Sequence, residues 1–188
     1  MIAMGSGDAA TRGRAVTWLN LQQASRVTHA RLEARLEAEA GLSWPEYELL
    51  FRLQFAGGRP LQMAEIADRL LASPSGITRL TDRLVVKELV DRQVPDDNRR
   101  VVRVTLTELG CKKLETADRI FHDFLEHSFA GPLTGEELQV LRSLLRKLLE
   151  HNGAWAPDRC DPAPGAEPGH VLSGGGPEPC LGTHYPFT

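Results

Sequence analysis

Cysteine and long apolar runs are scarce in this chain of 188 residues. Its three cysteines, Cys111, Cys160 and Cys180, are too few, too scattered and odd in number for the disulfide framework of a small secreted domain. No apolar run approaches the roughly 20 residues that a transmembrane helix needs, and residues 1–13 contain no apolar stretch of the secretory-signal type. We therefore expect a cytoplasmic protein with reduced thiols and no membrane partner.

An excess of charge of one sign is also absent. The chain carries 22 basic and 25 acidic residues, which gives a net charge of −3. Only one basic and four acidic residues follow position 151, so residues 1–150 hold 21 of each sign and are neutral overall. Net charge therefore neither favours nor excludes a polyanionic partner, and the placement of the arginines has to decide.

Recognisable catalytic and metal-binding motifs are missing from the sequence. It contains no P-loop, no G-x-S-x-G and no nucleophile with a base at a recognised spacing. The cysteines and histidines near the C-terminus lack C-x-x-C spacing, and His122 and His127, five residues apart, fall on different faces of a helix. We expect no enzymatic activity, no cofactor and no metal site.

Glycine and proline are concentrated at the C-terminal end, with seven of each in residues 152–188. Such a segment cannot bury enough apolar surface to offset its ordering entropy. We predict a disordered tail over 151–188, a short disordered lead over 1–13, and a single domain over 14–150.

Helical periodicity dominates the first part of this domain. Residues 14–40 indicate one long helix, which Gly41 ends. Ser43 and Glu46 form a capping box that begins a second helix, and this helix runs to about Phe55.

Two further helices are predicted at the end of the domain. The first covers about 108–130, and the second begins at a capping box formed by Thr134 and Glu137. The last helix carries an apolar stripe too extensive for a lone exposed helix, and we expect it to be covered by a second copy of the chain. The stripe consists of Leu138, Leu141, Leu145 and Leu148.

Between these helical parts lie two short helices and a hairpin. Residues 61–70 repeat apolar side chains at helical spacing, and Ser73-Pro74 opens a second helix. We expect this helix to bury Ile77, Leu80, Leu84 and Val85. The period then changes to two over 90–106, around a polar Pro-Asp-Asp-Asn tip, which predicts a β-hairpin. This order describes a winged helix-turn-helix, whose second helix can enter a DNA major groove.

The exposed face of that second helix offers small hydrogen-bonding groups, then arginines, with Asp82 on the same face. Short side chains let a helix approach base edges, and arginine can bridge guanine O6 and N7. Arginines at a wing tip suit the negative potential of a narrow minor groove. The candidate DNA-binding residues are Ser73, Ser75, Thr78, Arg79, Arg83, Arg99 and Arg100. The alternatives are a solvated helix face, with Asp82 pairing one of the arginines locally, and a charged hairpin tip that resists edge pairing.

Residues 63–110 resemble the MarR family of bacterial transcriptional regulators. The matching pieces are MAEIADRLLASPSGITRLTDRL, LVDR and NRRVVRVTLTELG, the last containing a wing signature that ends in L-T-x-x-G. The resemblance extends in helix order over about 14–150. It implies a mostly α fold, a winged helix-turn-helix with a β-hairpin wing and a helical dimerisation region. The DNA-binding lobe would cover about 60–107, and the dimerisation helices about 14–40 and 108–150.

Two positions depart from the family pattern. Asn98 stands where the family usually has Asp, which can hold a neighbouring arginine through an ion pair. Glu88 stands where the recognition helix usually ends at a glycine. A non-glycine residue in a left-handed conformation costs about 1 kcal/mol, so either this helix ends differently or the chain accepts the strain.

The resemblance implies a homodimeric repressor that reads a palindromic operator in double-stranded DNA and is relieved by a small, aromatic ligand. In the family the ligand pocket lies between the dimerisation region and the DNA-binding lobe. Trp18, His29, Tyr47 and Phe51 are candidates to line it, or are ordinary core and interface residues. No cysteine lies near the first helix, where some family members sense oxidants.

Two other functions remain open from the sequence. The first is a winged-helix module for protein interaction without sequence-specific DNA binding, which the two wing arginines disfavour. The second is a small ligand-binding or enzymatic protein, for which the sequence offers no convergent polar groups on buried faces.

Overall fold

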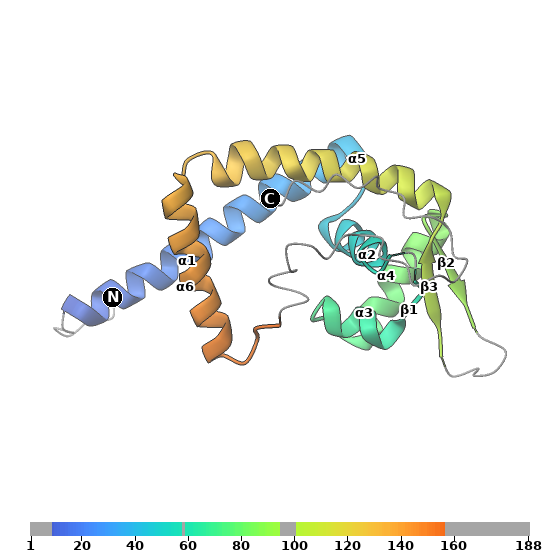
Figure 1. Cartoon of the computed structure of the whole chain (residues 1–188), viewed down its shortest axis with the longest axis horizontal. Helices are drawn as coiled ribbons and strands as arrows, with labels where there is room; N and C mark the ends of the chain where they lie inside the picture. Colours follow the sequence, from blue (N-terminus) through green and yellow to red (C-terminus); the bar gives the residue numbers. More distant parts are fainter. Residues whose placement is uncertain (1–8, 58, 95–100, 157–188) are drawn as a thin grey trace, which may run out of the picture.

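A long helical arm and a small mixed lobe make up the molecule, as shown by a computed structural model that describes residues 9–57, 59–94 and 101–156. Helices α1 (Ala9–Arg35), α5 (Glu108–Phe124) and α6 (Gly135–His151) form the arm (Figure 1). The lobe contains the remaining helices and the sheet. Its core is one cluster of buried apolar side chains that joins the end of the long first helix to the lobe and to α5.

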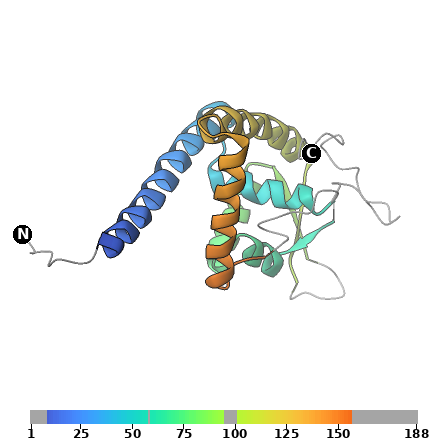
Figure 2. The ribbon, with the colours of Figure 1, turned by 60° about the vertical axis from the view of Figure 1, so that its left-hand side comes forward.

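The first helix is longer than the sequence predicts. It begins at Ala9, five residues before the expected start and inside the expected disordered lead. It continues through a π-helical turn, η1 (Leu36–Ala40), and ends at Gly41 with φ +64°, as predicted. Its C-terminal end is buried through Leu32 and Leu36, whereas the N-terminal half is exposed and projects from the lobe (Figure 2).

Helix α2 (Trp44–Phe55) has the predicted bounds. The backbone N–H of Ser43 donates to Glu46 Oε2 at 2.9 Å, which confirms the capping box. Gly57, with φ +66°, follows the helix and turns the chain toward the sheet.

The helix-turn-helix consists of α3 (Met63–Arg69) and α4 (Pro74–Val86). The helix predicted over 61–70 is shorter, because Leu61 and Gln62 instead form strand β1, which pairs with residues 103–104. Helical spacing does not distinguish two such residues from a first helical turn. Helix α4 buries three of the four predicted side chains, but Val85 is 39% exposed and Thr81 is buried instead.

The predicted hairpin is confirmed as β2 (Val90–Gln93) and β3 (Arg103–Leu106). The strands pair antiparallel, with Val90 opposite Leu106 and Gln93 opposite Arg103. With β1 they form a three-stranded sheet of order β1-β3-β2. The hairpin tip, residues 95–100, lies outside the described residues.

The two C-terminal helices follow the prediction closely. Helix α5 is extended by the π-helical turn η2 (Leu125–Ala130). At the start of α6, Thr134 N–H donates to Glu137 Oε2 and Glu137 N–H donates to Thr134 Oγ1, which confirms the second capping box. Helix α6 buries none of its residues within the single chain.

Cys111, in the first turn of α5, is disulfide-bonded, which contradicts the expectation of reduced thiols; the other two cysteines lie outside the described residues. Among the described residues, no helix is both long and apolar enough to span a bilayer.

Candidate nucleic-acid interface

Helix α4 separates a buried face from an exposed polar face. Ile77, Leu80 and Leu84 pack into the core, which fixes the rotation of the helix about its axis. Ser75, Arg79 and Arg83 are consequently exposed on the opposite side, and Thr78 is half-buried. The structure therefore brings five predicted DNA-binding residues (Ser73, Ser75, Thr78, Arg79 and Arg83) together at one helix.

The small side chains at the start of α4 are engaged locally. Ser73 Oγ accepts the backbone N–H of Gly76 at 3.2 Å and lies 3.3 Å from Ser75 Oγ. Thr78 Oγ1 donates to the carbonyl of Pro74 at 3.0 Å. Ser73 is thus the helix cap, and because it is exposed at the first turn it remains accessible to a phosphate beside the helix N-terminus.

Asp82 is bound by the wing and not by the neighbouring arginines of its own helix. Arg92 Nη1, on β2, lies 2.8 Å from Asp82 Oδ1, and both side chains are partly exposed. The alternative in which Asp82 pairs Arg79 or Arg83 is therefore wrong. The ion pair joins the second half of the recognition helix to the wing, a role for Arg92 that the sequence analysis missed.

A second ion pair holds the C-terminal end of α4 against α2. Lys87 Nζ, one residue after the helix, donates to Glu46 Oε2 at 2.8 Å, and Arg83 Nε lies 3.8 Å from Glu46 Oε1. Burial raises the pKa of Glu46, but the hydrogen bonds from Lys87 and the Ser43 backbone outweigh burial and leave this pKa below its usual value. Glu46 is therefore an ionised carboxylate beside two cations, one in the last turns of α4 and one just after it.

The backbone of Glu88, just after α4, shows which of the two predicted helix ends the chain adopts. Its φ is +59°, so this non-glycine residue adopts the left-handed conformation, and the strain is accepted. Leu71, in the turn between α3 and α4, is also left-handed, with φ +50°. The predicted wing-tip residues Arg99 and Arg100, and Asn98 beside them, lie outside the described residues.

Three of the four ligand candidates lie together in an aromatic cluster of α1, α2 and α5. The Tyr47 ring centroid is 6.0 Å from that of Phe51, and Trp44 connects Tyr47 to His29 at 5.6 and 5.9 Å. Phe121 of α5 completes the cluster, 5.3 Å from Tyr47. Trp44 and Phe121 were missed by sequence reasoning, because only the packing of α5 on α2 brings them beside the candidates.

The fold assigns different surroundings to these candidates. Tyr47 is 2% exposed and its hydroxyl donates to Asp118 Oδ1 at 2.8 Å, so it is a core residue with a satisfied polar end. Trp18 does not join the cluster. It is 60% exposed and borders a shallow hollow lined by α1 residues.

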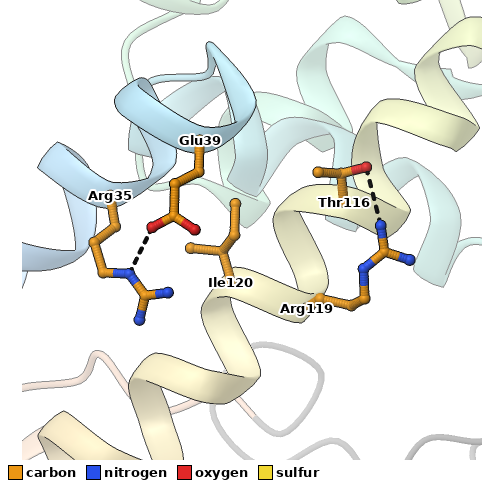
Figure 3. Close-up of a pocket in the computed structure, with 5 residues that line it drawn as sticks. All are labelled: Arg35, Glu39, Thr116, Arg119 and Ile120. Atoms are coloured by element: carbon orange, nitrogen blue, oxygen red, sulfur yellow. Dashed lines mark hydrogen bonds and ion pairs between the residues drawn. The ribbon is translucent and has the colours of Figure 1, made fainter.

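An open polar hollow lies between two parts of the chain. One side is formed by the end of α1 together with η1, and the other side by α5. Figure 3 shows Arg35 and Glu39 facing Ile120 across it, with Arg119 and Thr116 beyond. Arg35 Nε donates to Glu39 at 2.8 Å, and Arg119 donates to Thr116 at 3.3 Å. None of the four predicted ligand residues lines this hollow. In the described part of the chain, no group of three or more His, Cys, Asp or Glu side chains is arranged to hold a metal ion.

Comparison with known proteins agrees with this geometry. The MarR family model matches residues 40–100. The chain is 33% identical over 108 residues to the uncharacterised HTH-type transcriptional regulator YhbI of Bacillus subtilis, an alignment that covers 56% of this chain and 68% of YhbI.

Solved structures share the fold. The crystal structure of AbsC, a MarR family transcriptional regulator from Streptomyces coelicolor, has a TM-score of 0.69 at 24% identity and covers 75% of this chain and 95% of AbsC. A cysteine-to-serine mutant of Escherichia coli MarR, crystallised with operator DNA, has a TM-score of 0.65 at 23% identity and covers 76% of this chain and 99% of MarR.

Proposed function

The chain belongs to the MarR family, and from this premise we propose that it is a homodimeric transcriptional repressor that binds a palindromic operator and releases it on binding a small-molecule ligand. It acts where the bacterial chromosome lies, in the cytoplasm. The observation that carries the proposal is the exposed face of α4. Its opposite face is fixed in the core, so Ser75, Arg79 and Arg83 are presented as a group on a rigid helix.

Dimer formation is supported by apolar side chains that the single chain leaves uncovered. Val16, Trp18 and Leu19 of α1 are 49%, 60% and 63% exposed, and Leu144 and Leu148 of α6 are each 51% exposed. Both helices belong to the arm, and Figure 1 shows them at the end of the molecule away from the sheet. Covering these surfaces with a second copy removes apolar area from water, and two copies related by a dyad present two recognition helices to one palindrome.

Ligand binding is supported by the aromatic cluster around Tyr47. Its rings come from both the arm and the lobe, since His29 is on α1, Trp44 on α2 and Phe121 on α5. A small aromatic ligand inserted among them would stack on these rings and change how the arm sits on the lobe. Such a change would alter the spacing of the two recognition helices in the dimer.

The test is selection of binding sites from a random library of duplex DNA, followed by titration of the enriched duplex. We expect a palindromic consensus, a dimer by sedimentation at micromolar concentration, and a steep fall of log K with log salt, because phosphate contacts release counterions. The variant Arg79→Ala/Arg83→Ala should lose the enriched duplex, whereas Arg119→Ala, an exposed arginine of α5, should retain it. A folded monomer, or a library without any enriched sequence, would favour the protein-interaction module.

A further inference from the structure

Glu46 is an unusual residue for a capping position, because it is charged and almost fully buried. Its side chain is 4% exposed, whereas that of Glu65, at the same capping-box position of α3, is 33% exposed. A capping box needs only an acceptor at this position, and glutamine serves as well as glutamate. The cap therefore does not explain why a charge is buried here, since a buried carboxylate is costly unless it is paired.

The partners that require the charge are Arg83, on the recognition helix α4, and Lys87, its C-terminal cap residue. Arg83 and Lys87 are four residues apart and so lie on one side of α4. Lys87 Nζ contacts one carboxylate oxygen of Glu46 at 2.8 Å, and Arg83 Nε lies 3.8 Å from the other. Lys87 Nζ also donates to the carbonyl of Gly41 at 3.2 Å. One amine thus links the end of η1, the start of α2 and the end of α4.

We propose that Glu46 is a positioning residue for operator recognition, which fixes the C-terminal half of α4 through Lys87 and aims the guanidinium of Arg83 at DNA. This inference rests on the proposed function. It differs from that function in assigning a role to a buried acidic residue that cannot itself contact a polyanion.

The chemistry of arginine explains how the buried Glu46 can orient Arg83, which is on the exposed face of the helix. The guanidinium is a planar fork with five N–H donors, and ordering its long side chain costs conformational entropy. The carboxylate 3.8 Å from Nε lies beyond hydrogen-bond distance, but its charge attracts the guanidinium and restricts where the side chain lies, while the two terminal nitrogens remain available. Arg83 is 56% exposed, so its terminal nitrogens can reach solvent and a groove. Orienting the fork before binding reduces the ordering cost on the operator.

The test compares Glu46→Gln with Glu65→Gln. Each change keeps an acceptor for its capping box and removes one negative charge from the lobe. Glu46→Gln removes the ion pairs with Lys87 and Arg83, and Glu65→Gln removes the ion pair with Arg59. Only the ion pairs of Glu46 involve α4 and its C-terminal cap. The probes are the duplex selected by the wild-type protein and a scrambled duplex of the same composition, and the measured quantity is the ratio of the two affinities.

We expect Glu46→Gln to lower this ratio at least fivefold and to relax base preference where Arg83 reads, and Glu65→Gln to change it less than twofold. Lys87→Met, which keeps the aliphatic stem, should act in the same direction. The variant carrying both Glu46→Gln and Lys87→Met should be no worse than the worse single variant, because both remove the same pair. Thermal melting checks that each variant is folded at the assay temperature.

Two results would overturn the inference. One is an unchanged ratio in folded Glu46→Gln, and the other is an equal fall in both glutamine variants. If the wild-type protein itself selects no sequence, the proposed function fails first, and this inference fails with it.

Discussion

Gly110, in the first turn of α5, lies directly against the backbone carbonyl of Leu89, so closely that a Cβ at position 110 would overlap the oxygen. The side chain of Thr107 also joins these two segments through hydrogen bonds. Its hydroxyl donates to the carbonyl of Glu88 at 2.7 Å and accepts the N–H of Gly110 at 2.9 Å. The segment that leaves the recognition helix is thereby clamped to the start of the arm helix. The glycine of the L-T-x-x-G pattern is needed for this close approach.

Gly110→Ala should therefore destabilise the fold. Overpacking against a backbone group cannot be relieved by moving a flexible side chain, so we expect a loss of about 1–3 kcal/mol or more. The control is Gly135→Ala, in the first turn of α6, where an added Cβ meets nothing within 4 Å. Urea unfolding measures both, and equal effects of the two substitutions would contradict the clamp.

Glu88→Gly should have the opposite effect on stability. A residue with a side chain costs roughly 1 kcal/mol in the left-handed conformation, and glycine removes this cost. Glycine also has more conformational freedom in the unfolded chain, which offsets part of the gain in folding stability. Glu88→Ala is the matched control, since it deletes the carboxylate and keeps the Cβ. A gain of a few tenths to 1 kcal/mol in the glycine variant alone is expected from chemical unfolding. An equal gain with alanine would assign the effect to charge.

The ion pair between Asp82 and Arg92 should be visible as a coupling in DNA binding. Removing Arg92 leaves the Asp82 carboxylate unpaired on the helix that faces phosphates, so Arg92→Ala should weaken binding to the selected duplex several-fold. Asp82→Ala added to Arg92→Ala should restore part of the loss. The four affinities of this double-mutant cycle give the coupling energy, and strictly additive effects would mean that the pair does not act in recognition.

The recognition helix and the wing should differ in how they read DNA. Arg79→Ala should cost about 1–3 kcal/mol on the operator and relax preference at one position in each half-site, as expected for a base contact. Arg100→Ala should weaken binding in proportion to the A·T content beside the half-sites, because narrow grooves concentrate negative potential. Competition titrations over a panel of operator variants measure both. If both variants lose the same affinity on every operator variant, both arginines contact only phosphates.

The pH dependence of stability should reveal the ionised state of Glu46. Its folded-state pKa is lowered, so its ionised form contributes stability above the unfolded-state pKa, about 4.3, and this contribution is lost as the pH falls through the folded-state value. The melting temperature of the wild-type protein should exceed that of Glu46→Gln most clearly near pH 7, and the difference should shrink below about pH 4. A difference that is constant with pH would mean that the ion pair adds no stability.

Local signals in the sequence determined most of the secondary structure. The capping boxes at Ser43 and Thr134, the Ser73-Pro74 start and the left-handed Gly41 place the helix boundaries, because caps and turns depend on a few neighbouring residues. The change from helical to alternating period likewise located the hairpin. The same reasoning failed for β1, since a two-residue strand exists only through its partner across the sheet.

Contacts between distant segments were decided by the tertiary structure alone. The pairing of Asp82 with Arg92 depends on where the hairpin packs beside α4, and the pairing of Glu46 with Lys87 spans 41 residues of sequence. The same holds for Trp44 and Phe121, which meet only when α5 packs on α2. The sequence thus identified the arginines that face outward on α4, because their exposure follows from helical period. The ion pairs that join this helix to α2 and to β2 were set by packing, for which a single sequence carries no local signal.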